Sequence, residues 1–268
     1  MASITEFNSI RQPGWQTCPL DRVLGLVRLD QVSVAVEVNG HFERHPMGVA
    51  SAVLLDGTQR LVGAWLAGPD CDEATMWDRL LGLVRARGAQ DAFVVSCSQQ
   101  RSQPTAAQAA WPQAFVDATI MPLLRDAVAL TTWADRRKVL PLLRQILTAA
   151  DETAMVAGVD ALEATWGDCY PAVVARCRSH ADGLRALTGL DPALRQVMAA
   201  DNGIAHFEQK LRQIARHAVL AGETGEVDKL VAAADVGFLG LLTNATVGWN
   251  QAKNALAITH ADRLDEAR

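Results

Sequence analysis

The sequence predicts an α/β protein in which a mixed sheet is followed by a long series of helices. Its first hundred residues contain short apolar runs that either alternate with polar residues or are rich in β-branched residues. Pairs of residues typical of tight turns separate these runs, as is usual for strands. Beyond residue 118, leucine- and alanine-rich stretches with helical spacing replace these runs. Half of the 268 residues are hydrophobic, so the chain can bury a sizeable core.

The first three predicted strands form an antiparallel meander. Valines alternate with other residues over 32–38, and a second apolar run spans 49–55. An Asn-Gly pair follows the first run and an Asp-Gly pair follows the second, and a third run spans 60–66. Tight turns of this kind join strands that run in opposite directions.

An amphipathic helix separates the meander from a fourth strand. Asp72 can cap this helix and Gly88 stands where a helix commonly ends. The apolar face consists of Trp77, Leu80, Leu81 and Val84. The apolar stretch 92–95 follows a crossover helix, so we expect it to lie parallel to the first strand. The order β-β-β-α-β is the opening of a ribonuclease-H-like fold.

The rest of the chain is predicted to be helical, with no further strands after residue 118. The expected helices are 134–149, 152–166, 171–187, 202–218 and 227–242. We expect a ribonuclease-H-like mixed sheet with an all-helical insertion and C-terminal helices. The predicted domains are a flexible lead-in at 1–20, the core at 21–118, the insertion at 119–198, and helices at 199–268 that complete the core.

Composition limits the setting and the partners. There are 25 Lys and Arg residues against 30 Asp and Glu, and a net charge of -5 does not favour a protein that wraps nucleic acid. The five cysteines include no CxxC pair, which predicts neither a disulfide framework nor a zinc knuckle. With no signal peptide or membrane-spanning run recognised, we expect a cytoplasmic protein without a membrane partner.

Several segments stand in a fixed order along the chain. They are Gly63–Gly88, Thr131–Val139, Leu147–Glu152, Tyr170-Pro171, the run containing Asn202, Ile204, Leu211 and Arg212, and Trp249–Ile258. In this order, over residues 15–265, they resemble the mutator-type family of bacterial transposases. The resemblance implies a ribonuclease-H-like core in which three carboxylates hold two divalent metals for DNA cleavage and strand transfer.

The resemblance also assigns the three acidic positions. Asp30 on the first strand is acidic, but Cys97 and Ala205 occupy the second and third positions. A thiol is a poor ligand for Mg²⁺ and alanine offers none. Glu208, one helical turn beyond Ala205, would have to reach inward to replace the lost acid. Asp30 is therefore expected to be a remnant. We expect no metal and no cofactor, with the ancestral Mg²⁺ site lost.

Two further departures lead to the functional hypothesis. The family's Cys and His pair corresponds to Thr119 and Pro122, and the lead-in is short where the family carries a DNA-binding region. The sequence therefore predicts a domesticated pseudoenzyme, not an enzyme, that acts as a dimeric scaffold, regulator or partner-binding protein. Two alternatives stay open: a still-active metal-dependent transposase or nuclease with relocated carboxylates, or a different enzyme that uses Cys97 as its nucleophile.

The expected partners follow from the same reading. A homodimer is expected because related transposases pair through helical parts, and a heteromeric protein partner is possible. Weak DNA contact is expected through Lys210, Arg212 and Arg216, which form a basic run on one helix.

Overall fold

A computed structural model describes residues 18–38, 40–68, 70–99, 101–200, 203–220, 226–227, 229–230, 241–242 and 248–265. The chain forms two compact units. Unit 1 combines three stretches, 1–116, 201–246 and 262–268, and unit 2 combines 117–200 with 247–261. The sheet belongs mainly to unit 1, whereas the described part of unit 2 is largely helical.

Unit 1 is built around a mixed sheet with the strand order β5-β4-β1-β2-β3-β7, in which β6 also pairs with β1. β1 runs antiparallel to β2 and parallel to β4, and β2 runs antiparallel to β3. This arrangement confirms the predicted α/β class and is consistent with a ribonuclease-H-like core. The strands are Val23–Val38 (β1), His41–Val53 (β2), Gln59–Leu66 (β3), Asp91–Cys97 (β4), Phe115–Asp117 (β5), Val219–Leu220 (β6) and Leu241–Leu242 (β7).

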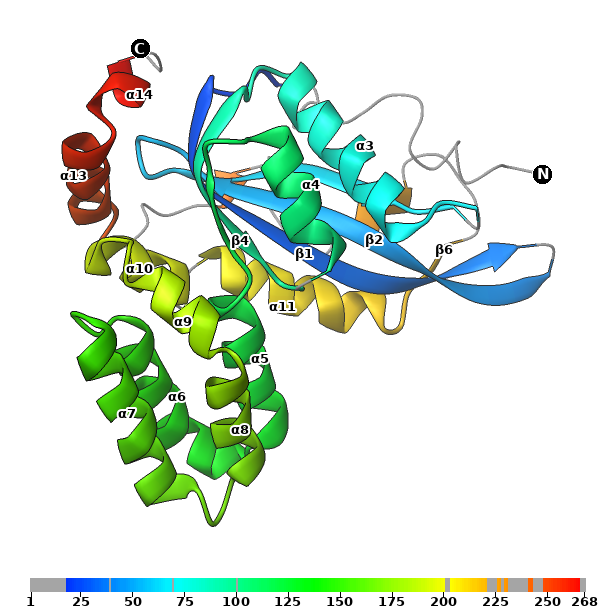
Figure 1. Ribbon diagram of the computed structural model, residues 1–268. Helices are drawn as coiled ribbons and strands as arrows, with labels where there is room; N and C mark the ends of the chain where they lie inside the picture. Colours follow the sequence, from blue (N-terminus) through cyan, green and yellow to red (C-terminus); the bar gives the residue numbers. More distant parts are fainter. Residues whose placement is uncertain are drawn as a thin grey trace. The chain divides into compact units, whose positions relative to one another are not determined.

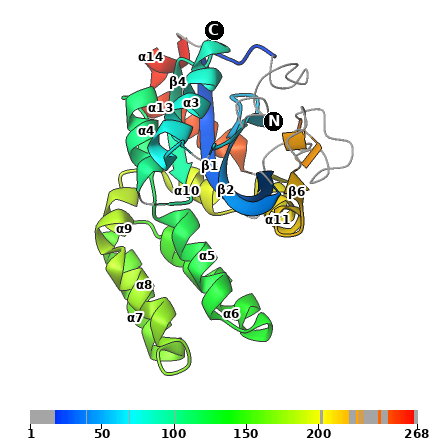
Figure 2. The same cartoon turned by 90° about the vertical axis from the view of Figure 1, so that its right-hand side faces the viewer.

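Helices cover both faces of this sheet. α3 (Glu73–Ala86) and α4 (Ser102–Ala110) lie on one face, and α11 (Gly203–Ala215) lies on the opposite face (Figures 1 and 2). Glycines let α3 approach closely, because a Cβ added at Gly63 would lie only 2.6 Å from a methyl carbon of Leu80. The sheet is therefore buried on both sides along its central strands.

The end of α3 is fixed to the strands beside it. Gly88 has φ 121°, and a Cβ there would lie 2.6 Å from the carbonyl oxygen of Leu20, so glycine is required. The preceding Arg87 donates from Nε to the Cys18 carbonyl at 2.9 Å and from its terminal nitrogen to the Val62 carbonyl at 2.6 Å. This pair of residues ends the helix and ties it to the sheet.

A short C-terminal helix returns to unit 1. In α14 (Ala261–Asp265), Arg263 donates two hydrogen bonds of 2.8 Å to the carboxylate of Asp91 at the start of β4. The same guanidinium lies 4.5 Å from the ring centroid of Phe93, two residues after Asp91 in β4. A bidentate arginine–carboxylate pair fixes geometry as well as charge.

Unit 2 is a set of packed helices with side-chain caps. Thr132 and Asp151 cap α6 and α7 by accepting hydrogen bonds from backbone N–H groups. The hydroxyl of Tyr170 donates to Asp135 at 2.7 Å and so joins the start of α8 to the first turn of α6. The helices are α5 (Ile120–Leu130), α6 (Trp133–Leu147), α7 (Glu152–Trp166), α8 (Pro171–Ser179), α9 (Ala181–Leu187), α10 (Pro192–Ala199) and α13 (Trp249–Thr259).

A buried arginine holds two of these helices together. Arg195 in α10 is wholly inaccessible to solvent. It donates to the carbonyl oxygen of Leu147, the last residue of α6, and to that of Leu190, each at 3.1 Å. Burial lowers the pKa of its guanidinium by desolvation. Arg195 thereby supplies a donor to the Leu147 carbonyl, which stands at the end of α6 and has no intrahelical N–H partner.

Several predicted elements need correction. The expected helix 171–187 is divided at His180, whose ring Nδ1 lies 2.8 Å from the Arg176 carbonyl and competes with the backbone ladder. The prediction that strands stop after residue 118 is wrong, because β6 and β7 extend the sheet. Most of the predicted helix 227–242 lies outside the described residues. Among the described helices, none has the length and apolar character needed to cross a membrane.

Candidate active site

Asp30 lies in the middle of β1 and is only 1% exposed. Its neighbour Gln31 pairs with Gly48 of β2, and a Cβ at Gly48 would contact side chains of α3. Successive residues of a strand project from opposite faces, so Asp30 projects from the face that α11 covers. The sequence therefore buries a carboxylate between the sheet and this helix.

Three charged residues form a series of ion pairs that ends at the Asp30 carboxylate. A terminal nitrogen of Arg212 donates to Asp30 Oδ2, and the same nitrogen lies 4.0 Å from Glu208 Oε2. On its other side, that glutamate oxygen lies 3.5 Å from a terminal nitrogen of Arg28. We call Asp30, Glu208, Arg28 and Arg212 the carboxylate–arginine cluster. Its two negative and two positive formal charges balance.

Burial differs among the four side chains of the cluster. The exposed fractions of the Asp30, Glu208 and Arg28 side chains are 2%, 4% and 7%, whereas that of Arg212 is 30%. Water and salt screen the buried charges weakly, so each depends on its neighbours for stabilisation. Arg212 is the member of the cluster that solvent reaches.

The sequence of α11 explains how Glu208 reaches this position. Phe207, Leu211 and Ala215 recur every four residues, are buried, and form the apolar stripe of the helix. Glu208 directly follows the first of these residues, and Arg212 stands one turn later on the same side. Because Glu208 stands at the edge of this buried stripe, its side chain is buried as well. The inward orientation required of Glu208 is therefore present.

The other two acidic positions are not part of the cluster. Cys97 at the end of β4 pairs with Leu29, so both project from the face opposite to Asp30. Its side chain is wholly buried, which does not favour its use as a nucleophile. Ala205 lies in α11, but its side chain is outside the described residues. Ser96, also buried, pairs with Arg28 and so projects from the Asp30 face.

The predicted basic run divides between two environments. Arg212 is held by Asp30, whereas Arg216, four residues later and just beyond α11, is exposed. Lys210 is half-buried and lies two residues before Arg212, on a different side of the helix. DNA contact through these three residues stays a prediction. Sequence reasoning missed Arg28, although its i, i+2 spacing from Asp30 places the two on one strand face.

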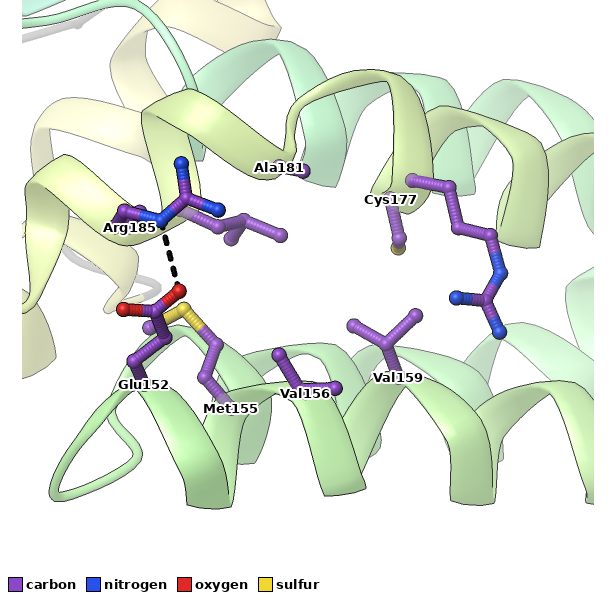
Figure 3. Close-up of a pocket in the computed structure, with 9 residues that line it drawn as sticks. Glu152, Met155, Val156, Val159, Cys177, Ala181 and Arg185 are labelled. Carbon is purple, nitrogen blue, oxygen red and sulfur yellow. Dashed lines mark hydrogen bonds and ion pairs between the residues drawn. The ribbon is translucent and has the colours of Figure 1, made fainter.

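Unit 2 contains a separate cavity of about 160 Å³ between α7 and the helices α8 and α9 (Figure 3). An ion pair of 2.7 Å between Glu152 and Arg185 stands at one end. Burial raises the pKa of the Cys177 thiol in its wall to about 11, so the thiol stays protonated at neutral pH. The remaining lining is Met155, Val156, Val159, Arg178, Ala181 and Leu184. This largely apolar cavity lacks a nucleophile for catalysis among the residues that line it.

Comparison with known proteins adds to this geometry. The family model described as "Transposase, Mutator family" matches residues 3–236. The chain belongs to the Mutator family of transposases. The match covers the cluster, strands β1 to β6 and most of the helices, so this Mutator-family chain carries the candidate site inside the matched region.

Curated relatives carry the same description. A probable transposase for an ISRM3-like insertion sequence element from Sinorhizobium fredii is 30% identical over 203 residues, 75% of this chain and 50% of that protein. The transposase for ISRM3 from Rhizobium meliloti gives the same identity and coverage. A probable insertion sequence transposase from Corynebacterium diphtheriae is 29% identical over 270 residues, 93% of this chain and 78% of its own length. The Mutator-family chain spans about half the length of the first two.

These findings correct the functional hypothesis drawn from the sequence. The prediction of a domesticated pseudoenzyme that is not an enzyme is wrong, because the family and its named relatives are transposases of insertion sequences. It treated the substitutions at Cys97 and Ala205 as the loss of the acidic site. Glu208, named from the sequence only as a residue that would have to reach inward, is a second buried carboxylate in the same cluster as Asp30.

Proposed function

We propose that this Mutator-family chain is the catalytic core of an insertion-sequence transposase, with Asp30 and Glu208 as its acidic residues. The observation that supports the proposal is that both buried carboxylates reach one nitrogen of Arg212. They come from β1 and α11, the strand and the helix to which the family resemblance assigns the first and third acids. The carboxylate set is therefore rearranged along α11, with Glu208 in place of the acid missing at Ala205.

The donor atoms of the cluster suit a divalent cation. Carboxylate oxygens are the ligands that Mg²⁺ and Mn²⁺ prefer, and Asp30 and Glu208 offer them from two sides. In the described parts of the chain, no group of three or more His, Cys, Asp or Glu side chains could hold a metal ion, so a cation at this cluster would have two carboxylates as its acidic ligands there. When bound, such a cation supplies Lewis-acid assistance to attack on a DNA phosphate. The sequence alone predicted no cofactor and a lost Mg²⁺ site, and the Mn²⁺ titration described below decides between that prediction and this proposal.

The protein groups around the pair have distinct roles in this proposal. Asp30 and Glu208 bind the cation and are kept from bulk water by the sheet and α11. Arg28 is a positioning residue, since its guanidinium lies 3.5 Å from Glu208 and is itself buried. It directs this carboxylate toward Asp30. Metal-assisted phosphoryl chemistry requires a protein to hold its metal ligands in a fixed position, and the neighbours of Glu208 would serve this purpose.

The test is cleavage of supercoiled plasmid DNA in the presence of Mn²⁺ or Mg²⁺. Asp30→Asn and Glu208→Gln are each expected to lower the nicking rate about 100-fold or more, because even residues that only support metal ligands contribute 10- to 100-fold. The matched control is Asp78→Asn, which removes an exposed acid from α3 and should leave the rate unchanged.

A second variant separates loss of chemistry from loss of folding. Asp30→Asn combined with Arg212→Gln removes one ion pair as a unit and keeps the buried charge balanced. If this double variant unfolds like the parent chain and does not nick DNA, whereas Arg212→Gln alone does, the carboxylate is required. Equal nicking rates in the parent chain, Asp30→Asn and Glu208→Gln would refute the proposal.

The remaining predictions from the sequence belong to the same proposal. We expect DNA to be the substrate and the chain to act in the cytoplasm. A homodimer and a heteromeric protein partner also stay predictions, and light scattering coupled to size exclusion would measure the mass of the assembly. No observation favours an enzyme that uses Cys97, because its thiol is buried on the other face of the sheet.

A further inference from the structure

The charge balance of the carboxylate–arginine cluster limits what else can enter it. Asp30 and Glu208 are already neutralised by Arg28 and Arg212. A divalent cation added beside both arginines would bring a third cationic group into a weakly screened site. Its repulsion of the two guanidinium groups favours the departure of one arginine when a cation binds. Arg28 is 7% exposed, but the 30% exposed Arg212 can turn outward to solvent.

We infer that Arg212 exchanges partners: it neutralises Asp30 in the metal-free chain, and it binds a DNA phosphate after a divalent cation displaces it. This inference rests on the proposed function and deepens it, by assigning to one arginine both the competition with the cation and the contact with the substrate. Arg212 is a substrate-contacting residue only in the metal-bound state.

The chemistry of the displaced side chain supports the second half of the exchange. A guanidinium forms bidentate, charge-assisted hydrogen bonds with phosphate as readily as with carboxylate. Exposed Arg216 lies four residues later, just beyond α11, and its N–H donates to the Arg212 carbonyl at 3.2 Å, so the outward-turned Arg212 would join a second cation close by. The two arginines would then face the same stretch of DNA backbone.

The first experiment measures Mn²⁺ binding through the loss of the free-ion paramagnetic resonance signal. Arg212→Gln should bind Mn²⁺ about tenfold more tightly than the parent chain, because the competing cation has been removed. Arg216→Gln is the matched control, since it removes an exposed arginine just beyond the end of the same helix, and it should bind Mn²⁺ like the parent chain.

The second experiment measures the salt dependence of binding to a short duplex by fluorescence anisotropy. Each phosphate contact contributes about 0.9 to the slope of log K against log salt concentration. With Mn²⁺ present, the slope for Arg212→Gln should be smaller than that of the parent chain by about 1. Without Mn²⁺ the two slopes should agree, because Asp30 then holds Arg212. Any effect of Arg216→Gln should be the same in both conditions.

The outcomes separate the two proposals. If Arg212→Gln and the parent chain bind Mn²⁺ equally, or if their slopes agree in its presence, the exchange is overturned and the carboxylate site is not affected. If neither binds Mn²⁺ at all, both the exchange and the metal site of the proposed function fail together. Glu208→Gln should abolish the binding that the parent chain has, which assigns the measured ion to this cluster.

Discussion

Replacement of Arg195 by methionine tests how unit 2 is held together. The wild-type guanidinium is fully buried and donates to the carbonyls of Leu147 and Leu190 at 3.1 Å each. Methionine retains much of the volume of the arginine stem but has no donor. Arg195→Met would therefore leave the buried Leu147 carbonyl and the partly buried Leu190 carbonyl without the N–H groups that now satisfy them.

The size of the effect can be worked out from these two contacts. A buried acceptor left without a donor costs about 1–3 kcal/mol, and removal of a buried charge returns part of its desolvation cost. We expect a net loss of about 2–4 kcal/mol, which is a large share of the stability of a typical domain. The loss should fall on unit 2, to which all three residues belong.

Urea unfolding, followed by circular dichroism and by hydrogen exchange of unit 2 amides, would measure this loss. Arg185→Met is the control, because that arginine is 58% exposed and solvent screens its surface ion pairs, which contribute little to stability. If Arg195→Met unfolds at the same urea concentration as the parent chain, the two carbonyl contacts do not stabilise the junction of α6 and α10.

Three further predictions concern other residues. Arg263→Ala should release α14, raise hydrogen exchange at the start of β4 and lower the free energy of unfolding by about 1.5–3 kcal/mol. Unchanged exchange there would show that the Arg263–Asp91 pair does not hold α14 to the strand. Gly88→Ala should lower the free energy of unfolding by more than about 1 kcal/mol, since its positive φ and the nearby carbonyl both oppose a Cβ, and a neutral effect in thermal melts would count against this. Cys177 should react with a maleimide far more slowly at pH 8 than exposed Cys169. Because its pKa is raised to about 11, the folded thiol resists ionisation, so its contribution to stability should decline above about pH 9.

The sheet was largely predictable from the sequence because its signals are local. Asn-Gly and Asp-Gly pairs mark two hairpins, and glycine at position 88 marks a helix end, since few other residues adopt the required backbone angles. β6 and β7 carry too few residues to produce a periodic pattern, so they were missed. Their pairing depends on strands far away in the chain.

The candidate site was only partly predictable. Asp30 could be found from the resemblance, but the contribution of Glu208 depends on how far α11 is rotated against the sheet, which sequence spacing alone does not fix. Comparison with the family position by position counted Ala205 as a loss. Phe207 and Leu211 form an apolar stripe that packs on the sheet. Glu208 directly follows Phe207, so its carboxylate is buried beside this stripe.

The two compact units are interleaved along the chain, and this affects how the protein can be divided. Residues 117–200 interrupt unit 1, and 247–261 return to unit 2 before α14 rejoins the sheet. A single cut at any point therefore leaves at least one unit incomplete. During synthesis, Asp30 emerges long before Arg212 and Glu208, so the buried charges of β1 gain their neighbours on α11 only after most of the chain has been made.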